Sequence, residues 1–190
     1  MNTRFLTIPG LASSGPQHWQ TIWEMQYPHL FSRVEQVNWD WPVKNEWVDK
    51  LQERISKLTE PTILIAHSLG CITVAHWAQE FKSEYVEGAM LVAPADADLS
   101  KRLNFVVDFA PIPLLKLPFK SVVIASTNDR YASISRSQYL AQKWGSEFVN
   151  LGRKGHINAI SGLEDWQEGK QILEEFSSFK LIGSEGYLTS

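Results

Sequence analysis

The sequence predicts an α/β fold of three layers, in which a mostly parallel sheet of about six strands lies between helices on both faces. Three observations predict it. Short apolar runs recur at wide spacing, stretches with helical spacing separate them, and the third and fifth runs are nearly continuous in Ile, Val, Leu and Ala, as is typical of buried parallel strands. The expected strands cover residues 4–10, 34–39, 62–68, 88–94 and 121–127, with a weaker sixth at 147–152.

The expected helices alternate with these strands. After the second strand, Trp47, Leu51 and Ile55 fall on one helical stripe, which predicts a helix with one buried face. Gly145 stands where the fourth helix should end, because glycine readily adopts the left-handed conformation of a helix C-cap. The helical stretches are 18–31, 43–58, 71–81, 135–145 and 162–176.

Length and composition narrow the class of protein. The 190 residues fit a single domain, 1–190, and a chain of this length buries roughly 70% of its unfolded surface. A net charge of −3 with mixed signs argues against a nucleic-acid binder, and no run approaches the ~18 apolar residues of a membrane span. We expect no signal peptide, because the first residues show no charged stretch followed by a long apolar run. The single cysteine, Cys71, cannot form an internal disulfide. We expect a cytoplasmic protein with no metal and no organic cofactor.

Two segments depart from the alternating pattern. Residues 96–118 are too rich in proline for one regular helix and too apolar for a solvated loop. They form either a cap over the substrate or a segment packed beside the sheet. The tail, 177–190, is expected to be loosely held.

Three polar residues follow successive expected strands. Ser68 ends the third strand, Asp129 follows the fifth, and His156 lies in a glycine-flanked loop after the sixth. Functional groups of parallel sheets gather at the carboxyl ends of the strands. The order Ser, Asp, His is that of hydrolases in which a sharp strand-to-helix turn displays a serine nucleophile.

The surroundings of Ser68 suit such a turn. The turn needs small residues two positions before and two after the serine, and here these are Ala66 and Gly70. The Leu69 amide at the start of the next helix could then donate a hydrogen bond to an oxyanion. The alternative is a serine that only caps that helix.

A serine nucleophile needs a base, and the base needs a carboxylate. Among the five histidines we favour His156, because its long loop can bring the imidazole over the edge of the sheet. Asp129 is the preferred acid, with Asp96 and Asp98 as alternatives.

A second oxyanion donor should come from the loop after the first strand. That loop is rich in small residues, and the Leu11 amide is the first candidate, with the Ala12 amide next. His18 and Trp19 open the following helix and are expected to line the site, although core packing explains Trp19 equally well.

The chain resembles the small α/β-hydrolases of the YdeN-like, retinoblastoma-binding-protein-nine family of serine hydrolases. The resemblance covers about residues 4–176 and rests on "IPGLASSGPQHWQ", "AHSLGC", "FAPIPLLKLPFKSVVIASTNDRYAS" and "GRKGHINAISG". It implies a compact α/β-hydrolase fold and a Ser-Asp-His triad at Ser68, Asp129 and His156, which selects Asp129 over the other aspartates. One departure is Arg130, where many relatives carry proline.

The expected function is that of a serine hydrolase of a small carboxylic ester or amide, acting through an acyl-enzyme on Ser68. The expected partner is this small-molecule substrate, and a protein partner is left open. The alternative is a non-catalytic binding protein on a hydrolase scaffold, which the eight tryptophans would suit at an interface.

Overall fold

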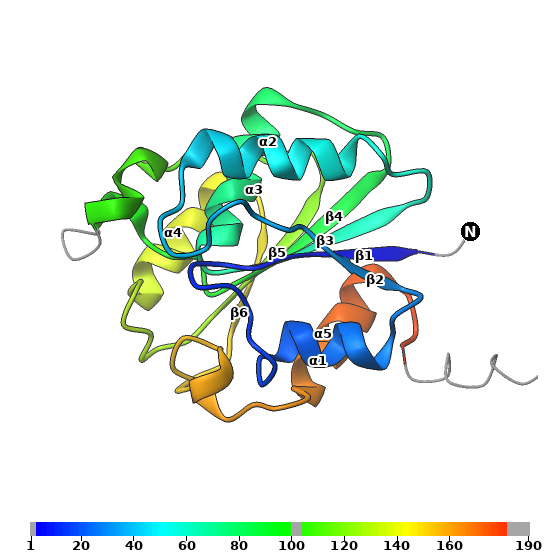
Figure 1. Cartoon of the computed structure of the whole chain (residues 1–190). Coiled ribbons are helices and arrows are strands. Elements are labelled where there is room, and N and C mark those ends of the chain that lie inside the picture. Colours follow the sequence, from blue (N-terminus) through cyan, green and yellow to red (C-terminus); the bar gives the residue numbers. More distant parts are fainter. Residues whose placement is uncertain (1–2, 100–103, 182–190) are drawn as a thin grey trace, which may run out of the picture.

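The computed structural model of this chain describes residues 3–99 and 104–181 (Figure 1). Six parallel strands form one sheet in the order β2-β1-β3-β4-β5-β6, which confirms the predicted parallel sheet. The strands are β1 (Arg4–Ile8), β2 (Phe31–Arg33), β3 (Thr62–His67), β4 (Val86–Val92), β5 (Lys120–Ala125) and β6 (Glu147–Asn150).

Helices cover both faces of the sheet, as predicted (Figure 1). One face carries α2, α3 and α4, and the opposite face carries α1 and α5. The helices are α1 (Trp19–Gln26), α2 (Lys44–Ile55), α3 (Leu69–Glu80), α4 (Ile134–Trp144) and α5 (Gln167–Ser177), with 3-10 turns η1 (Ala97–Leu99), η2 (Asn104–Phe109) and η3 (Ala159–Ser161). Gly145 caps α4 in the left-handed conformation, as its sequence position predicted.

The second strand differs from its predicted position. β2 is Phe31–Arg33, whereas the sequence pattern placed a strand at 34–39. The amide of Val34 still bonds to the Thr7 carbonyl, but the chain then leaves the sheet, and Val37 is exposed. As an edge strand, β2 has a single neighbouring strand, and it pairs with β1 over three residues only. The apolar residues that follow therefore lie outside the sheet.

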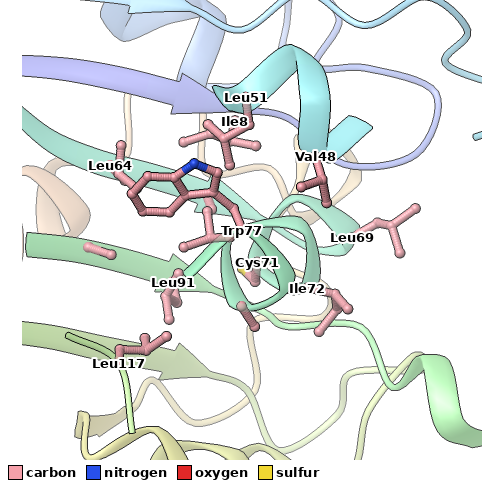
Figure 2. Close-up of a cluster of buried hydrophobic side chains, with 14 of the residues drawn as sticks. Ile8, Val48, Leu51, Leu64, Leu69, Cys71, Ile72, Trp77, Leu91 and Leu117 are labelled. Atoms are coloured by element: carbon pink, nitrogen blue, oxygen red, sulfur yellow. The ribbon is translucent and has the colours of Figure 1, made fainter. Parts of the chain in front are cut away.

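The core beneath α2, α3 and α4 centres on α3. Figure 2 shows Trp77 of this helix among Leu51 of α2 and Leu64 and Leu91 of the sheet. All six residues of β3 are buried, and α3 is buried from Leu69 to Trp77. An element that is apolar on every side has to lie inside the molecule, so β3 and α3 form its centre.

The opposite face holds an aromatic cluster. Trp19 and Trp23 of α1 stand 4.7 Å apart between ring centroids, and Trp166 packs against both, at 4.9 and 5.8 Å. Phe5 of β1 stacks on Phe31 of β2 at the far side of the cluster. These rings join α1, the sheet and the start of α5 into one apolar unit.

Part of the described segment 96–118 packs against helices. Val106, Phe109 and Leu117 are buried in the α3 core. The His76 imidazole donates to the Phe109 carbonyl over 2.9 Å, and Trp144 of α4 donates to Pro113 over 2.7 Å. Residues 100–103 lie outside the described residues, and a substrate-covering role of this segment stays a prediction.

The tail predicted to be loosely held begins inside α5. Leu181 is fully buried, its amide donates to Glu174, and Phe179 meets Phe5 edge-on at 5.6 Å. For residues 177–181 the structure therefore differs from the expectation, while 182–190 lie outside the described residues. Among the described helices, none has the length and apolar character that crossing a membrane requires.

The sheet places the loop after β1 next to the turn that follows β3. The chain passes from β1 to β2 on one side and then crosses to β3 on the other, so the carboxyl ends of β1 and β3 form a topological switch point. Gly70 at the start of α3 rests on the end of β1: a Cβ there would lie 2.7 Å from the Pro9 carbonyl oxygen and closer still to that of Ile8.

We expect Gly70→Ala to lower the free energy of unfolding by about 1–3 kcal/mol, because two backbone carbonyls cannot move aside for the added methyl group. Gly15→Ala is the matched control, since a Cβ at Gly15 meets nothing within 4 Å. Urea unfolding followed by circular dichroism measures both. Equal midpoints for the two variants would show that the approach of α3 to β1 tolerates a side chain.

Candidate active site

Ser68 occupies a sharp turn between β3 and α3. Its backbone has φ 55° and ψ −119°, a left-handed region that side chains rarely adopt. Small neighbours make room for this turn. Ala66 is fully buried, and a Cβ at Gly10 would lie 2.8 Å from Cβ of Ser68. The geometry is that of a nucleophile elbow, which presents a serine hydroxyl at the carboxyl edge of the sheet.

The side chains of Ser68, His156 and Asp129 form one hydrogen-bonded chain. His156 Nδ1 lies 2.7 Å from Asp129 Oδ2, and His156 Nε2 lies 2.8 Å from Ser68 Oγ. A carboxylate only accepts, so Nδ1 donates its hydrogen to Asp129 and the lone pair of Nε2 faces the serine hydroxyl. The structure thus brings the three predicted residues together from the ends of β3, β5 and β6.

The Asp129 carboxylate is fully engaged. Its Oδ1 accepts from the Tyr131 amide over 2.8 Å, and its side chain is only 4% exposed. The alternatives Asp96 and Asp98 instead form ion pairs with Arg136 of α4. The carboxylate beside His156 is therefore that of Asp129.

The loop that carries His156 contains unusual backbone angles. Gly155 has φ 59° and Ile157 has φ 49°, and a β-branched residue at positive φ is a genuine outlier. Asn128 holds the entrance to the loop, because its Oδ1 accepts from the Gly155 amide over 2.8 Å and from Ser126 Oγ over 2.9 Å. Sequence reasoning did not assign a role to Asn128.

The two candidate oxyanion donors of the backbone are free. Within the described parts of the chain, the amides of Leu11 and Leu69 have no hydrogen-bond partner. The Ala12 amide donates to the Trp39 carbonyl over 2.9 Å, so it is not available. Because a Cβ at Gly10 would lie 3.2 Å from the Leu69 amide, the loop after β1 passes close beside that amide.

Aromatic rings surround the imidazole of His156. Tyr131 lies 4.4 Å and His67 4.9 Å away between ring centroids, and His18 packs edge-on against His67 at 4.7 Å. His18 thus lies near the site, as predicted, and caps α1 by accepting from the Gln20 amide. Tyr131 carried no sequence signal beyond its position after Asp129.

Burial keeps the flanking histidines neutral. Desolvation is the main reason why the pKa of His18 falls to about 3, and the charges of Arg33 and His156 add to it. Burial likewise holds the pKa of His67 well below its usual value, with His18 and His156 as further causes. A neutral His67 therefore donates through Nε2 to the His156 carbonyl, over 2.9 Å.

The remaining sequence candidates have simpler surroundings. Cys71 is fully buried, burial raises the pKa of its thiol, and it donates to the Val92 carbonyl. A buried protonated thiol of this kind is unreactive. Arg130, the departure beside Asp129, is exposed. No group of three His, Cys, Asp or Glu side chains in the described chain could hold a metal ion.

Comparison with known proteins places this chain in a family. A family described as "Serine hydrolase" matches residues 5–175. A crystal structure of a Pectobacterium atrosepticum protein described as a YdeN-like hydrolase is 36% identical, with a TM-score of 0.83 over 93% of this chain and 91% of that one. The chain belongs to the YdeN-like serine hydrolase family.

More distant relatives share the fold of this serine hydrolase. The YdeN protein of Bacillus subtilis is 23% identical over 83% of this chain and 87% of its own length, and its crystal structure gives a TM-score of 0.79. A monoacylglycerol lipase of Paleococcus ferrophilus is 14% identical, with a TM-score of 0.68 over 92% of this chain and 93% of that one. The predicted α/β-hydrolase fold is thereby confirmed.

The neutral His18 predicts an acid-sensitive stability. The pKa of His18 in the folded protein is about 3, below the ordinary 6.5. Between pH 3 and pH 6.5, His18 is therefore protonated in the unfolded chain and neutral in the folded serine hydrolase. The free energy of unfolding should therefore fall as pH falls from about 7 to about 5, by up to ~1.4 kcal/mol per pH unit for this residue. We expect His18→Asn to make that slope shallower, since asparagine keeps the helix cap without titrating.

The measurement is the urea midpoint of wild type and variant across this pH range. His29→Asn serves as the control, because His29 is exposed. An identical pH slope in wild type and His18→Asn would contradict a buried neutral imidazole at position 18.

Proposed function

We propose that this serine hydrolase cleaves a small carboxylic ester or amide through an acyl-enzyme on Ser68. The observation that carries the proposal is the chain of short hydrogen bonds from Ser68 Oγ through His156 to Asp129. A serine hydroxyl is a weak nucleophile until an adjacent base can take its proton. Here the unprotonated Nε2 stands 2.8 Å from that hydroxyl.

The first half of the reaction would form the acyl-enzyme. As Ser68 Oγ attacks the carbonyl carbon, its proton passes to His156 Nε2, and the Asp129 carboxylate stabilises the resulting imidazolium. The imidazolium then gives this proton to the leaving alcohol or amine, and the C–O or C–N bond breaks. The amides of Leu11 and Leu69 are the donors for the oxyanion, since both are free of partners in the described chain.

The second half would release the acid. As His156 takes a proton from water, the water oxygen attacks the acyl carbonyl. The bond between the acyl carbon and Ser68 Oγ then breaks, and the imidazolium returns the proton to Ser68 Oγ. The same side chains therefore serve both halves. The alternative of a binding protein on this scaffold would not need an aligned Ser-His-Asp chain, so the geometry supports catalysis.

The proposal also covers the size of the substrate and the location of the protein in the cell. The substrate is a small molecule, and the protein acts in the cytoplasm, where a reduced thiol such as Cys71 persists.

We expect a fluorophosphonate probe to add once to the wild-type protein, because it traps an activated serine. Ser68→Ala removes the nucleophile and His156→Ala removes the base, so neither variant should gain mass. Intact-mass spectrometry reads the adduct, and circular dichroism checks that both variants fold. An adduct on folded Ser68→Ala would place the reactive group elsewhere, and no adduct on folded wild type would contradict the hydrolase mechanism.

Asp129→Asn should lower kcat on p-nitrophenyl acetate by about 10³- to 10⁴-fold, because the amide of asparagine favours the wrong imidazole tautomer. Asp98→Asn is the matched control: it makes the same change at an aspartate that binds Arg136 rather than His156. Steady-state kinetics measures both. Equal losses in the two variants would mean that Asp129 does not orient His156.

A further inference from the structure

Two side chains outside the Ser-His-Asp chain hold the backbone at His156. His67 Nε2 donates to the His156 carbonyl over 2.9 Å, and Trp19 Nε1 donates to the Ile157 carbonyl over 2.8 Å. Both donors are buried: Trp19 is 1% and His67 5% exposed. Two consecutive carbonyls of the loop are thus fixed by rings from two other elements, the end of β3 and the start of α1.

The backbone between these carbonyls is strained. Ile157 is β-branched and fully buried, yet it has φ 49°. Such a conformation persists only where the surroundings hold it from several sides. The two hydrogen bonds supply that hold, since they fix the peptide groups on both sides of Ile157.

Holding these peptide groups limits where the imidazole of His156 can point, because the side chain leaves a Cα whose own carbonyl is held by His67. Asn128 adds a second hold earlier in the loop, since it accepts from the Gly155 amide in the peptide group between Lys154 and Gly155. The backbone at His156 is therefore held directly on its C-terminal side and, through Gly155, on its N-terminal side.

We propose that His67 and Trp19 form a carbonyl clamp that positions His156, and that the clamp matters most in the acyl-enzyme. This inference rests on the proposed function. Before the reaction Ser68 Oγ itself bonds to His156 Nε2. Once Oγ carries the acyl group it has no hydrogen to donate, so one of the contacts that align the ring is lost. Asp129 and the clamp then have to keep Nε2 aimed at the attacking water.

The chain offers a matched pair of tryptophans for the test. Trp19 and Trp23 lie on the same helix, both are buried, and both donate through Nε1 to a backbone carbonyl near the C-terminal end of the chain. The acceptor of Trp23 is the Asp165 carbonyl, at 2.9 Å, which lies after the loop of His156 and just before α5. Changing either residue to phenylalanine removes one hydrogen bond and keeps most of the ring.

The main experiment is pre-steady-state hydrolysis of p-nitrophenyl acetate by wild type, Trp19→Phe and Trp23→Phe. We expect Trp19→Phe to slow the steady-state rate, which reports deacylation, by about 10- to 100-fold, while the initial burst slows less. KM should fall together with kcat, because slower deacylation lets the acyl-enzyme accumulate, so kcat/KM should change less than kcat. Trp23→Phe should stay within about 2-fold of wild type in both phases. Equal rates for the two variants would overturn the clamp.

A second pair of variants tests the other donor and guards against misfolding of Trp19→Phe. His67→Gln keeps an N–H donor of similar reach, whereas His67→Phe keeps a ring and loses the donor. The clamp predicts that glutamine restores most of the deacylation rate that phenylalanine loses. Equal rates for His67→Gln and His67→Phe would show that this hydrogen bond has no positioning role.

Hydrogen exchange separates failure of the clamp from failure of the proposed function. Exchange followed by mass spectrometry needs no turnover and reports the amides of residues 152–158 directly. We expect faster exchange there in Trp19→Phe, and faster exchange near residue 165 instead in Trp23→Phe. If wild type shows neither burst nor fluorophosphonate adduct, the hydrolase mechanism is wrong. The exchange rates of 152–158 still show whether the clamp holds this loop. Unchanged exchange of 152–158 in Trp19→Phe would overturn the clamp whatever the activity.

Discussion

The close approach of the end of β1 to the start of α3 is the constraint on which the site depends. Ser68 can adopt its left-handed turn only because Gly10 leaves space beside its Cβ and Gly70 lets the helix backbone rest on the carbonyls of Ile8 and Pro9. The same contact brings the loop after β1 next to the Leu69 amide. One backbone-to-backbone contact thus shapes both the displayed serine and the pair of free amides around it.

The sequence predicted an element best where a single physical requirement determines which residues can stand at its positions. Continuous burial made β3 and β5 recognisable, and the need for a left-handed residue made Gly145 a readable helix end. It failed at β2, because a three-residue edge strand has too short an apolar pattern to fix its limits. The residues alone also left three aspartates open, since ion pairing of Asp96 and Asp98 with Arg136 depends on how α4 packs.

The roles of His67 and Asn128 were out of reach of sequence reasoning for a different reason. Both act on backbone groups of a distant loop, His67 on the His156 carbonyl and Asn128 on the Gly155 amide. Every residue type carries these backbone groups, so the residue type at the partner position gives no sign of the hydrogen bond. His67 beside Ser68 was consistent with simple packing, and only the fold shows that its ring also donates.

The neutral state of the flanking imidazoles bears on the chemistry of His156. In the proposed acyl transfer His156 takes up a positive charge, and a second positive charge at His67, whose ring lies 4.9 Å away, or at His18, which packs against His67, would oppose this. Burial keeps both uncharged, and the charged group that bonds to the imidazole in the described part of the chain is the Asp129 carboxylate. Neutrality also preserves the acceptor role that a charged ring would lose, because the His18 Nδ1 must stay unprotonated to cap α1. The burial that lowers the stability of the fold in acid therefore keeps positive charge away from His156, the proposed base, at neutral pH.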